Sequence, residues 1–122
     1  MPDNSHIVVW SEIPVTDMDR AKRFYGAVLE QKLTDETNAP NPMANFTAPD
    51  GAVSGHIYPG KPAPKGTGNT VHLAAPGKLE ATMERVREAG GEVVSPAVDI
   101  PPGRFFYALD PDGNSIGFFE MR

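Results

Sequence analysis

The 122-residue sequence contains no cysteine, and its basic residues are outnumbered by acidic ones. Without cysteine this chain forms no disulfide bonds and offers no thiolate ligands and no cysteine nucleophile, a composition typical of cytoplasmic proteins. Eleven lysines and arginines stand against sixteen aspartates and glutamates, for a formal net charge of −5. Because binding to a nucleic-acid backbone needs clusters of Lys and Arg, we expect no nucleic-acid partner.

Long apolar runs are also missing. No segment approaches the roughly 20 apolar residues that a membrane-spanning helix requires. The first residues lack the basic region and the apolar run of a secretory signal. We therefore expect a cytoplasmic protein without a membrane partner. Thirteen prolines and twelve glycines mark turns between periodic apolar segments rather than disorder.

The sequence does contain a repeat. A turn followed by a strand occupies residues 110–120, beginning with the letters DPDGN, and a weaker copy occupies residues 49–58, beginning with PDG. The same offset of 62 positions relates two further pairs, which are Trp10 with His72 and Gly55 with Gly117. An offset shared by so many positions predicts two copies of one structural unit.

Each copy is predicted to hold one helix and four strands. In the first copy, β-branched residues and apolar periodicity predict a strand over 6–13, a helix over 17–30 with Thr16 as its N-cap, and strands over 31–37, 43–48 and 52–58. The second copy repeats this order, with a strand over 69–75, a helix over 78–89, and strands over 92–98, 104–109 and 115–121.

These elements predict an α+β fold. Two βαβββ modules, residues 1–60 and 69–122, are expected to form curved mixed sheets around a concave site. The proline- and glycine-rich stretch 61–68 is the expected linker, and the whole is one structural domain.

Three stretches carry a resemblance to a known family. They are a strand followed by Pro14-x-x-Asp17-x-x-x-Ala21-x-x-Phe24-Tyr25, the helix end Ala89-Gly90-Gly91, and the turn Asp110-Pro111-Asp112-Gly113-Asn114. With these the chain resembles the vicinal oxygen chelate superfamily, which includes glyoxalase I, extradiol dioxygenases, fosfomycin-resistance enzymes and bleomycin-resistance proteins. The resemblance implies the two-module fold described above and, as in similar short members, a homodimer.

The metal enzymes of this family hold a divalent ion with side chains on the first and last strands of each module. Carried over by motif, the four ligand positions fall on Trp10, Gly55, His72 and Gly117. Only His72 can coordinate a metal, so we expect no resident metal and no cofactor. Ligation of a divalent metal by His72 is the less favoured alternative.

Glu12 is the most informative polar residue. Strand alternation places it on the same face as Val8 and Trp10, and the resemblance assigns that face to the concavity. A dry and unpaired carboxylate there would cost several kcal/mol, on the order of the usual penalty for a buried charge. Glu12 therefore faces water and pairs with a nearby arginine, or it acts as a general base or as an acceptor for a ligand.

His72 is the other catalytic candidate, as a neutral base paired with Glu12, and its bland alternative is a cavity-lining histidine bonded to backbone or water. Trp10 either stacks on a planar ligand or plugs the cavity. His56, next to Gly55, is expected on the face that packs against the helix. At least one side chain of the run Phe105-Phe106-Tyr107 is expected to line the cavity.

The favoured function is that of a glyoxalase/bleomycin-resistance-like protein with a metal-independent pocket for a small organic molecule. The expected ligand-binding residues are Trp10, Glu12, Gly55, His72 and Gly117. One alternative is a glyoxalase-like lyase or isomerase that uses Glu12 and His72, with or without a divalent metal. The other is a plugged cavity in a protein that acts through its dimer or a partner surface.

Overall fold

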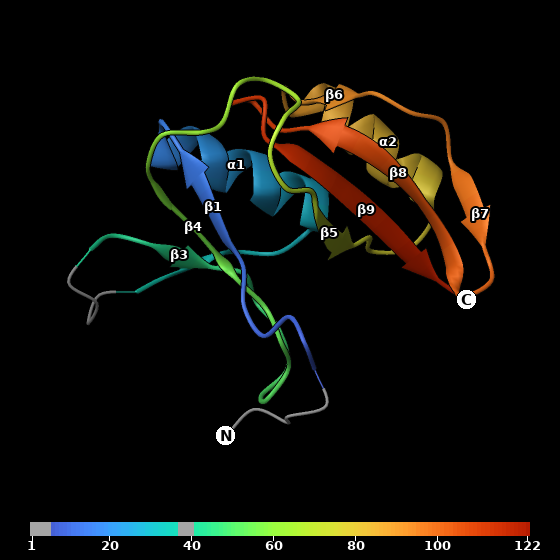
Figure 1. Cartoon of the computed structure of the whole chain (residues 1–122), viewed down its shortest axis with the longest axis horizontal. Helices are drawn as coiled ribbons and strands as arrows, with labels where there is room; N and C mark the ends of the chain where they lie inside the picture. Colours follow the sequence, from blue (N-terminus) through green and yellow to red (C-terminus); the bar gives the residue numbers. More distant parts are fainter. Residues whose placement is uncertain (1–5, 37–40) are drawn as a thin grey trace.

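The computed structural model describes residues 6–36 and 41–122 of the chain. Its elements follow in the order β1 (Glu12–Val15), α1 (Met18–Leu29), β2 (Thr34–Asp35), β3 (Ala44–Asn45), β4 (His56–Pro59), β5 (Val71–Ala74), α2 (Leu79–Glu88), β6 (Glu92–Val93), β7 (Val98–Ile100), β8 (Gly103–Leu109) and β9 (Ser115–Met121). Figure 1 shows the two helices behind the strands. Within this part of the chain, neither helix is long and apolar enough to traverse a bilayer.

The strands form two sheets. The first sheet has the order β1-β4-β3-β2, and the second has the order β5-β9-β8-β6, with β7 paired to β8. In each sheet the first and last strands of the repeat run parallel, as β1 with β4 and β5 with β9, and the other pairs are antiparallel. The α+β fold with two mixed sheets is therefore confirmed. Strand β7 is an addition to the second copy that the repeat did not predict.

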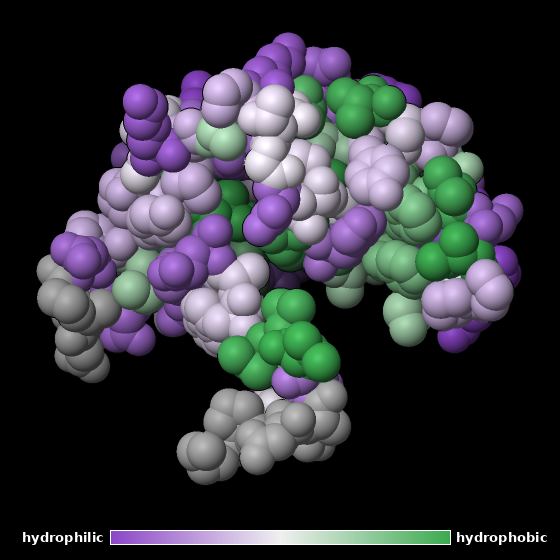
Figure 2. All heavy atoms as spheres, viewed as in Figure 1, coloured by the Kyte–Doolittle hydropathy of each residue, from purple (hydrophilic) through white to green (hydrophobic). Residues whose placement is uncertain are grey.

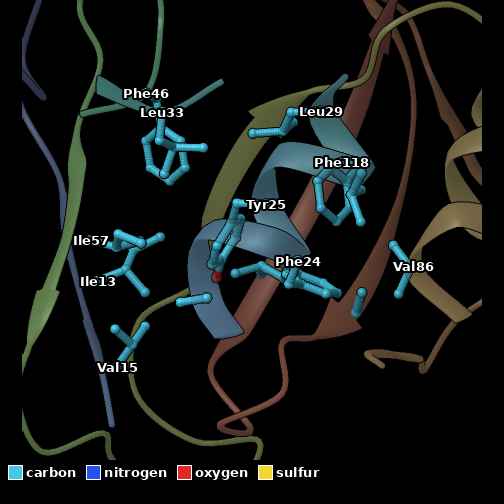
Figure 3. Packing of buried hydrophobic residues seen from close by; sticks show 14 of the residues in the cluster. Ile13, Val15, Phe24, Tyr25, Leu29, Leu33, Phe46, Ile57, Val86 and Phe118 are labelled. Atoms are coloured by element: carbon cyan, nitrogen blue, oxygen red, sulfur yellow. The ribbon is translucent and has the colours of Figure 1, made fainter. Parts of the chain in front are cut away.

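The core lies between the two sheets and the helices. Ile13 and Val15 of β1 and Ile57 of β4 are buried and point toward α1, whose Tyr25 faces them, while Phe24 points to the other side of α1, toward Val86 (Figure 3). These are the odd positions of β1, so strand alternation sends the even positions to the face away from α1. On the second sheet the corresponding helix-facing side chains are Phe106, Ala108, Ile116 and Phe118.

The first predicted strand is misplaced. The prediction spanned residues 6–13, but β1 begins at Glu12, and the described residues before it form no strand. Ile7 in that segment is 95% exposed. The residues of this segment do have high β-propensity, but a strand also needs a neighbouring strand with which to pair. Pro14 lies inside β1 because β1 is the edge of its sheet, where a missing N–H is tolerated.

The first helix begins one residue later than predicted. Asp17 is its N-cap, and its carboxylate accepts a hydrogen bond from Arg20 N at 3.1 Å. The expected cap, Thr16, instead donates its backbone N–H to Asp112 Oδ2 at 3.2 Å. The second helix ends one residue earlier than predicted, at Glu88, and Gly90 follows it in the left-handed region at φ 97°.

The turn over residues 110–114 joins the two sheets. Asp110 is buried, and its Oδ1 accepts the backbone N–H groups of Asp112 and Asn114, both at 2.9 Å. Its Oδ2 accepts the Tyr25 hydroxyl of α1 at 2.6 Å. The Asn114 amide then donates to Pro14 O of β1 at 2.8 Å. The turn that precedes β9 is thus bonded to both β1 and α1.

Burial, followed by the neighbouring Asp110 charge, raises the pKa of the Tyr25 phenol well above its usual value. Tyr25 therefore stays a hydrogen-bond donor to the carboxylate. Replacing it by phenylalanine removes that donor and leaves the buried carboxylate one partner short. We expect Tyr25→Phe to lower the free energy of unfolding by about 1–3 kcal/mol, measured by urea denaturation.

The matched control is Tyr107→Phe, the same chemical change at an exposed tyrosine of β8. It should change stability by no more than about 0.5 kcal/mol. Equal stability of the two variants would show that the Tyr25–Asp110 bond does not contribute as described.

Candidate functional site

A groove of about 940 Å³ runs between the two sheets. One side is formed by β1 and the residues before it, and the other by β5, and both strands are sheet edges without a partner on the groove side among the described residues. The C-terminal end of α1, the chain over 46–48, 53–55 and 63–70, and the start of β9 also contribute to the lining. The space-filling view shows the surface hollowed beside the apolar side chains at the lower centre (Figure 2).

The groove lining is polar but nearly uncharged. Hydrogen-bonding groups come from Ser11, Gln31, Thr70, Asn114 and other neutral side chains, with aliphatic residues between them. Among the described residues that line the groove, Glu12 alone carries a formal charge, and no lysine or arginine is present. Such a surface suits an organic molecule better than a phosphate or another anion, which would meet a carboxylate and no cation.

Glu12 takes part in a hydrogen-bonded row with His56 and Trp10. The Trp10 indole N–H donates to His56 Nδ1 at 2.9 Å, and His56 Nε2 lies 3.2 Å from Glu12 Oε1. An indole nitrogen can only donate, so Nδ1 carries no proton. The pattern assigns the imidazole proton to Nε2, which donates it to the carboxylate. His56 in this arrangement is neutral and fixes the position of Glu12.

The expectation that His56 packs against the helix is wrong. Glu12 and His56 are directly opposite each other in the β1–β4 register, and Ile57, the next residue, faces α1. His56 therefore lies on the face away from α1, where Trp10 and Tyr58 leave it only 5% exposed. The error came from the assumption that Gly55 belongs to the concave face.

The two glycines that the repeat pairs are not equivalent in space. A Cβ at Gly55 would collide with the hydroxyl and the backbone of Ser11, whereas a Cβ at Gly117 would collide with the ring of His72. Ser11, and not Trp10, is thus the neighbour of Gly55. Both glycines are required by the close approach of the neighbouring strand, and the space beside them is filled by the Ser11 hydroxyl and the His72 imidazole.

His72 belongs to an aromatic group on the second sheet, on the face away from α2. Its ring centroid lies 5.3 Å from that of Phe105, 5.7 Å from that of Tyr107 and 6.5 Å from that of Phe119. Partial burial lowers the pKa of the imidazole below its usual value of 6.5, so His72 is neutral at pH 7. Phe106, between the two aromatic neighbours in sequence, is fully buried in the core.

The predicted site residues are only partly gathered in the groove. Trp10, Glu12, Gly55 and His72 line it, and Gly117 lies under the His72 ring outside the lining. None of Phe105, Phe106 and Tyr107 lines the groove. Glu12 and His72 are both present, but the bonded partner of Glu12 is His56. Trp10 is 44% exposed and forms part of the wall, so it does not plug the groove.

Two residues at the site were missed. The environment of Ser11 became visible only with the β1–β4 register, because the repeat offset placed Trp10 beside Gly55. One sequence signal pointed to His56. In a strand, residues two positions apart lie on the same face, so His56 and Tyr58 share a face of β4. The roles of Ser11 and His56 depend on the residue-by-residue register between β1 and β4. The sequence repeat does not give that register.

The donor set does not fit the divalent metal that the family resemblance implies. In residues 6–36 and 41–122, no three His, Cys, Asp or Glu side chains lie close enough to hold an ion together. His72 lies on the sheet surface beside aromatic rings, without a second and third ligand among the described residues, and Glu12 is bonded to a histidine whose other nitrogen is occupied by Trp10. A protein metal site needs three or four convergent ligands, and these two side chains do not provide them.

Comparisons with known proteins agree with this architecture. A glyoxylase-like domain-containing protein of Didymella fabae is 33% identical over 118 residues, covering 85% of each chain. The protein CFP32 of Mycobacterium tuberculosis is 27% identical over 119 residues, which is 91% of this chain and 44% of that protein. The chain thus spans less than half the length of this mycobacterial relative.

Solved structures share the fold at lower identity. A glyoxalase/bleomycin resistance protein from Albidiferax ferrireducens superimposes with a TM-score of 0.67 at 21% identity, covering 96% of this chain and all of that one. The fosfomycin resistance protein FosX of Listeria monocytogenes gives 0.67 at 16% identity, covering 94% and 93%. The family model described as Glyoxalase/Bleomycin resistance protein/Dioxygenase superfamily matches residues 5–118. The chain therefore belongs to the glyoxalase/bleomycin resistance protein/dioxygenase superfamily.

Proposed function

We propose that this protein binds a small organic molecule in the groove between β1 and β5, without a resident metal or cofactor. The observation that carries the proposal is the groove itself, a volume of about 940 Å³ with neutral polar and apolar walls. Pockets of this size, with a few convergent polar groups, are the usual form of a small-molecule site. Trp10, Glu12, Gly55 and His72 are the proposed contacts, with Gly117 giving His72 room to lie flat.

A second candidate function is acid–base catalysis of the lyase or isomerase type. The observation that favours it is the fixed position of Glu12, whose carboxylate is held by the neutral imidazole of His56 while 65% of its side chain stays exposed. A carboxylate oriented in this way can accept a proton from a bound substrate. The same arrangement serves equally for binding alone, so binding is the function that we put first.

We further propose that the protein is a cytoplasmic homodimer. The cytoplasmic assignment rests on the absence of cysteine from the sequence. The dimer rests on the segment before β1, where Ile7, Val8 and Val9 are 95%, 70% and 50% exposed. This apolar patch lies at the lower centre of Figure 2. A contiguous exposed apolar patch is typical of an interface, and a second copy of this chain is the proposed partner.

Binding in the groove can be followed by the emission of Trp10, the single tryptophan. We expect several members of a panel of small, water-soluble organic molecules to quench or shift it in a saturable way. Ala74→Leu places extra volume on the groove face of β5 and should weaken this binding about tenfold or more, because leucine fills space that the ligand needs.

The control for this substitution is Ala27→Leu, which adds the same volume at an exposed position of α1 outside the groove and should leave binding unchanged. Absence of a saturable response across the panel would contradict a ligand site in the groove. Equal binding by Ala74→Leu and Ala27→Leu would contradict it as well.

Metal independence is tested by thermal melting with EDTA and with Ni²⁺, Zn²⁺, Mn²⁺ or Fe²⁺. An ion bound at 100 times its dissociation constant would stabilise the fold by about 2.7 kcal/mol. We expect the melting temperature to change by less than about 1 °C, because His72 alone cannot supply such affinity. A larger rise that disappears in His72→Asn, together with stoichiometric metal by elemental analysis, would refute metal independence.

The dimer is tested by sedimentation velocity. We expect the wild-type chain to sediment at twice its monomer mass, and Ile7→Asp to raise the dimer dissociation constant at least about tenfold, because an interface charge must be desolvated. Val94→Asp is the control, since Val94 is an exposed valine directly after β6, away from this segment. A monomeric wild type, or equal weakening by both variants, would exclude this apolar segment as a dimer interface.

A further inference from the structure

We propose that the ligand of the groove is an organic cation, such as an amine, amidine or guanidine, and that Glu12 is its counter-charge. The inference deepens the proposed function and rests on it, because it names the class of molecule that the same groove selects. The inference starts from the charge of the groove. Among the described residues that line the groove, Glu12 is the one with a formal charge.

The carboxylate of Glu12 is not neutralised by its own partner. His56 accepts the Trp10 N–H at Nδ1, so its single proton is on Nε2 and the ring carries no charge. The bond from His56 to Glu12 therefore orients the carboxylate and leaves its full negative charge. One carboxylate oxygen is used by His56, and the other is free among the described side chains to accept from a ligand.

Two further features favour a positive ligand. Trp10 lies on the same face as Glu12, where its ring can stack on a planar cation or receive it in a cation–π contact. The chain as a whole has a net charge of −5, which adds long-range attraction for cations and repulsion for anions. No basic side chain of the lining competes for Glu12, because its described residues include no lysine or arginine.

Three probes of one shape separate charge from fit. Benzamidinium is a planar cation, benzamide is its neutral isostere, and benzoate is the corresponding anion. A charged donor paired with a carboxylate adds about 1.5–3 kcal/mol over a neutral contact, which corresponds to roughly tenfold or more in affinity. We expect calorimetry and Trp10 emission to show the affinity order benzamidinium, then benzamide, then benzoate.

The variants assign that preference to one side chain. Glu12→Gln keeps the shape and the acceptor for His56 and should remove the tenfold advantage of benzamidinium, while benzamide binding changes by less than about twofold. Glu12→Asp keeps the charge and should retain part of the preference. Glu84→Gln removes the same charge from the exposed side of α2, where Glu84 pairs with Arg87, and should alter neither affinity.

The outcomes distinguish this inference from the proposed function. Equal binding of benzamidinium and benzamide by the wild type, or an unchanged preference in Glu12→Gln, would overturn the cation assignment and leave the groove as a ligand site. An equal loss of preference in Glu84→Gln would also overturn it, by showing that net charge alone is responsible. No binding of any probe or panel molecule would overturn both.

Discussion

The buried carboxylate of Asp110 is the interaction on which the rest of the structure depends. It organises the turn before β9 through two backbone N–H groups and fixes that turn to α1 through the Tyr25 hydroxyl. The same turn contacts β1 through Asn114 and the start of α1 through Asp112. Because β9 pairs with β5, this one turn determines how far β1 lies from β5. The groove is the space between those two strands, so its width is a consequence of a buried hydrogen-bond network.

The chemistry of the groove is set in part by the residues at the four positions that the family resemblance assigned to a metal. A tryptophan and two glycines stand there beside one histidine, and that histidine is packed among aromatic rings. The row of hydrogen bonds across β1 and β4 instead links Trp10, at one of these positions, with His56 and Glu12. The row ends in an exposed negative charge, which suits recognition of a ligand by its charge and hydrogen-bond donors.

Much of the fold was predictable because it depends on local patterns. The helices follow from apolar periodicity, and they were predicted to within about one residue at each end. The turn over 110–114 follows from its proline, glycine, Asp and Asn residues. The start of β1 was not predictable in this way, because Ile7, Val8 and Val9 have strand-forming side chains but no strand beside them in the described chain.

The site was harder to predict, because it depends on register. The repeat offset of 62 aligned Gly55 with Gly117 and Trp10 with His72. The register differs by one residue between the two sheets, because Ser11 lies beside Gly55 in the first sheet, whereas His72 lies beside Gly117 in the second. A shift of one residue moves a side chain to the other face of a sheet. That shift is why the sequence predicts the wrong face for His56.

The most direct test of this account is a crystal structure of the protein with 4-bromobenzamidinium, located by the anomalous signal of bromine. The account predicts a bromine peak in the groove between β1 and β5, with the amidinium about 3 Å from a carboxylate oxygen of Glu12. Bromine peaks found only outside the groove, with Glu12 in contact with solvent alone, would contradict it.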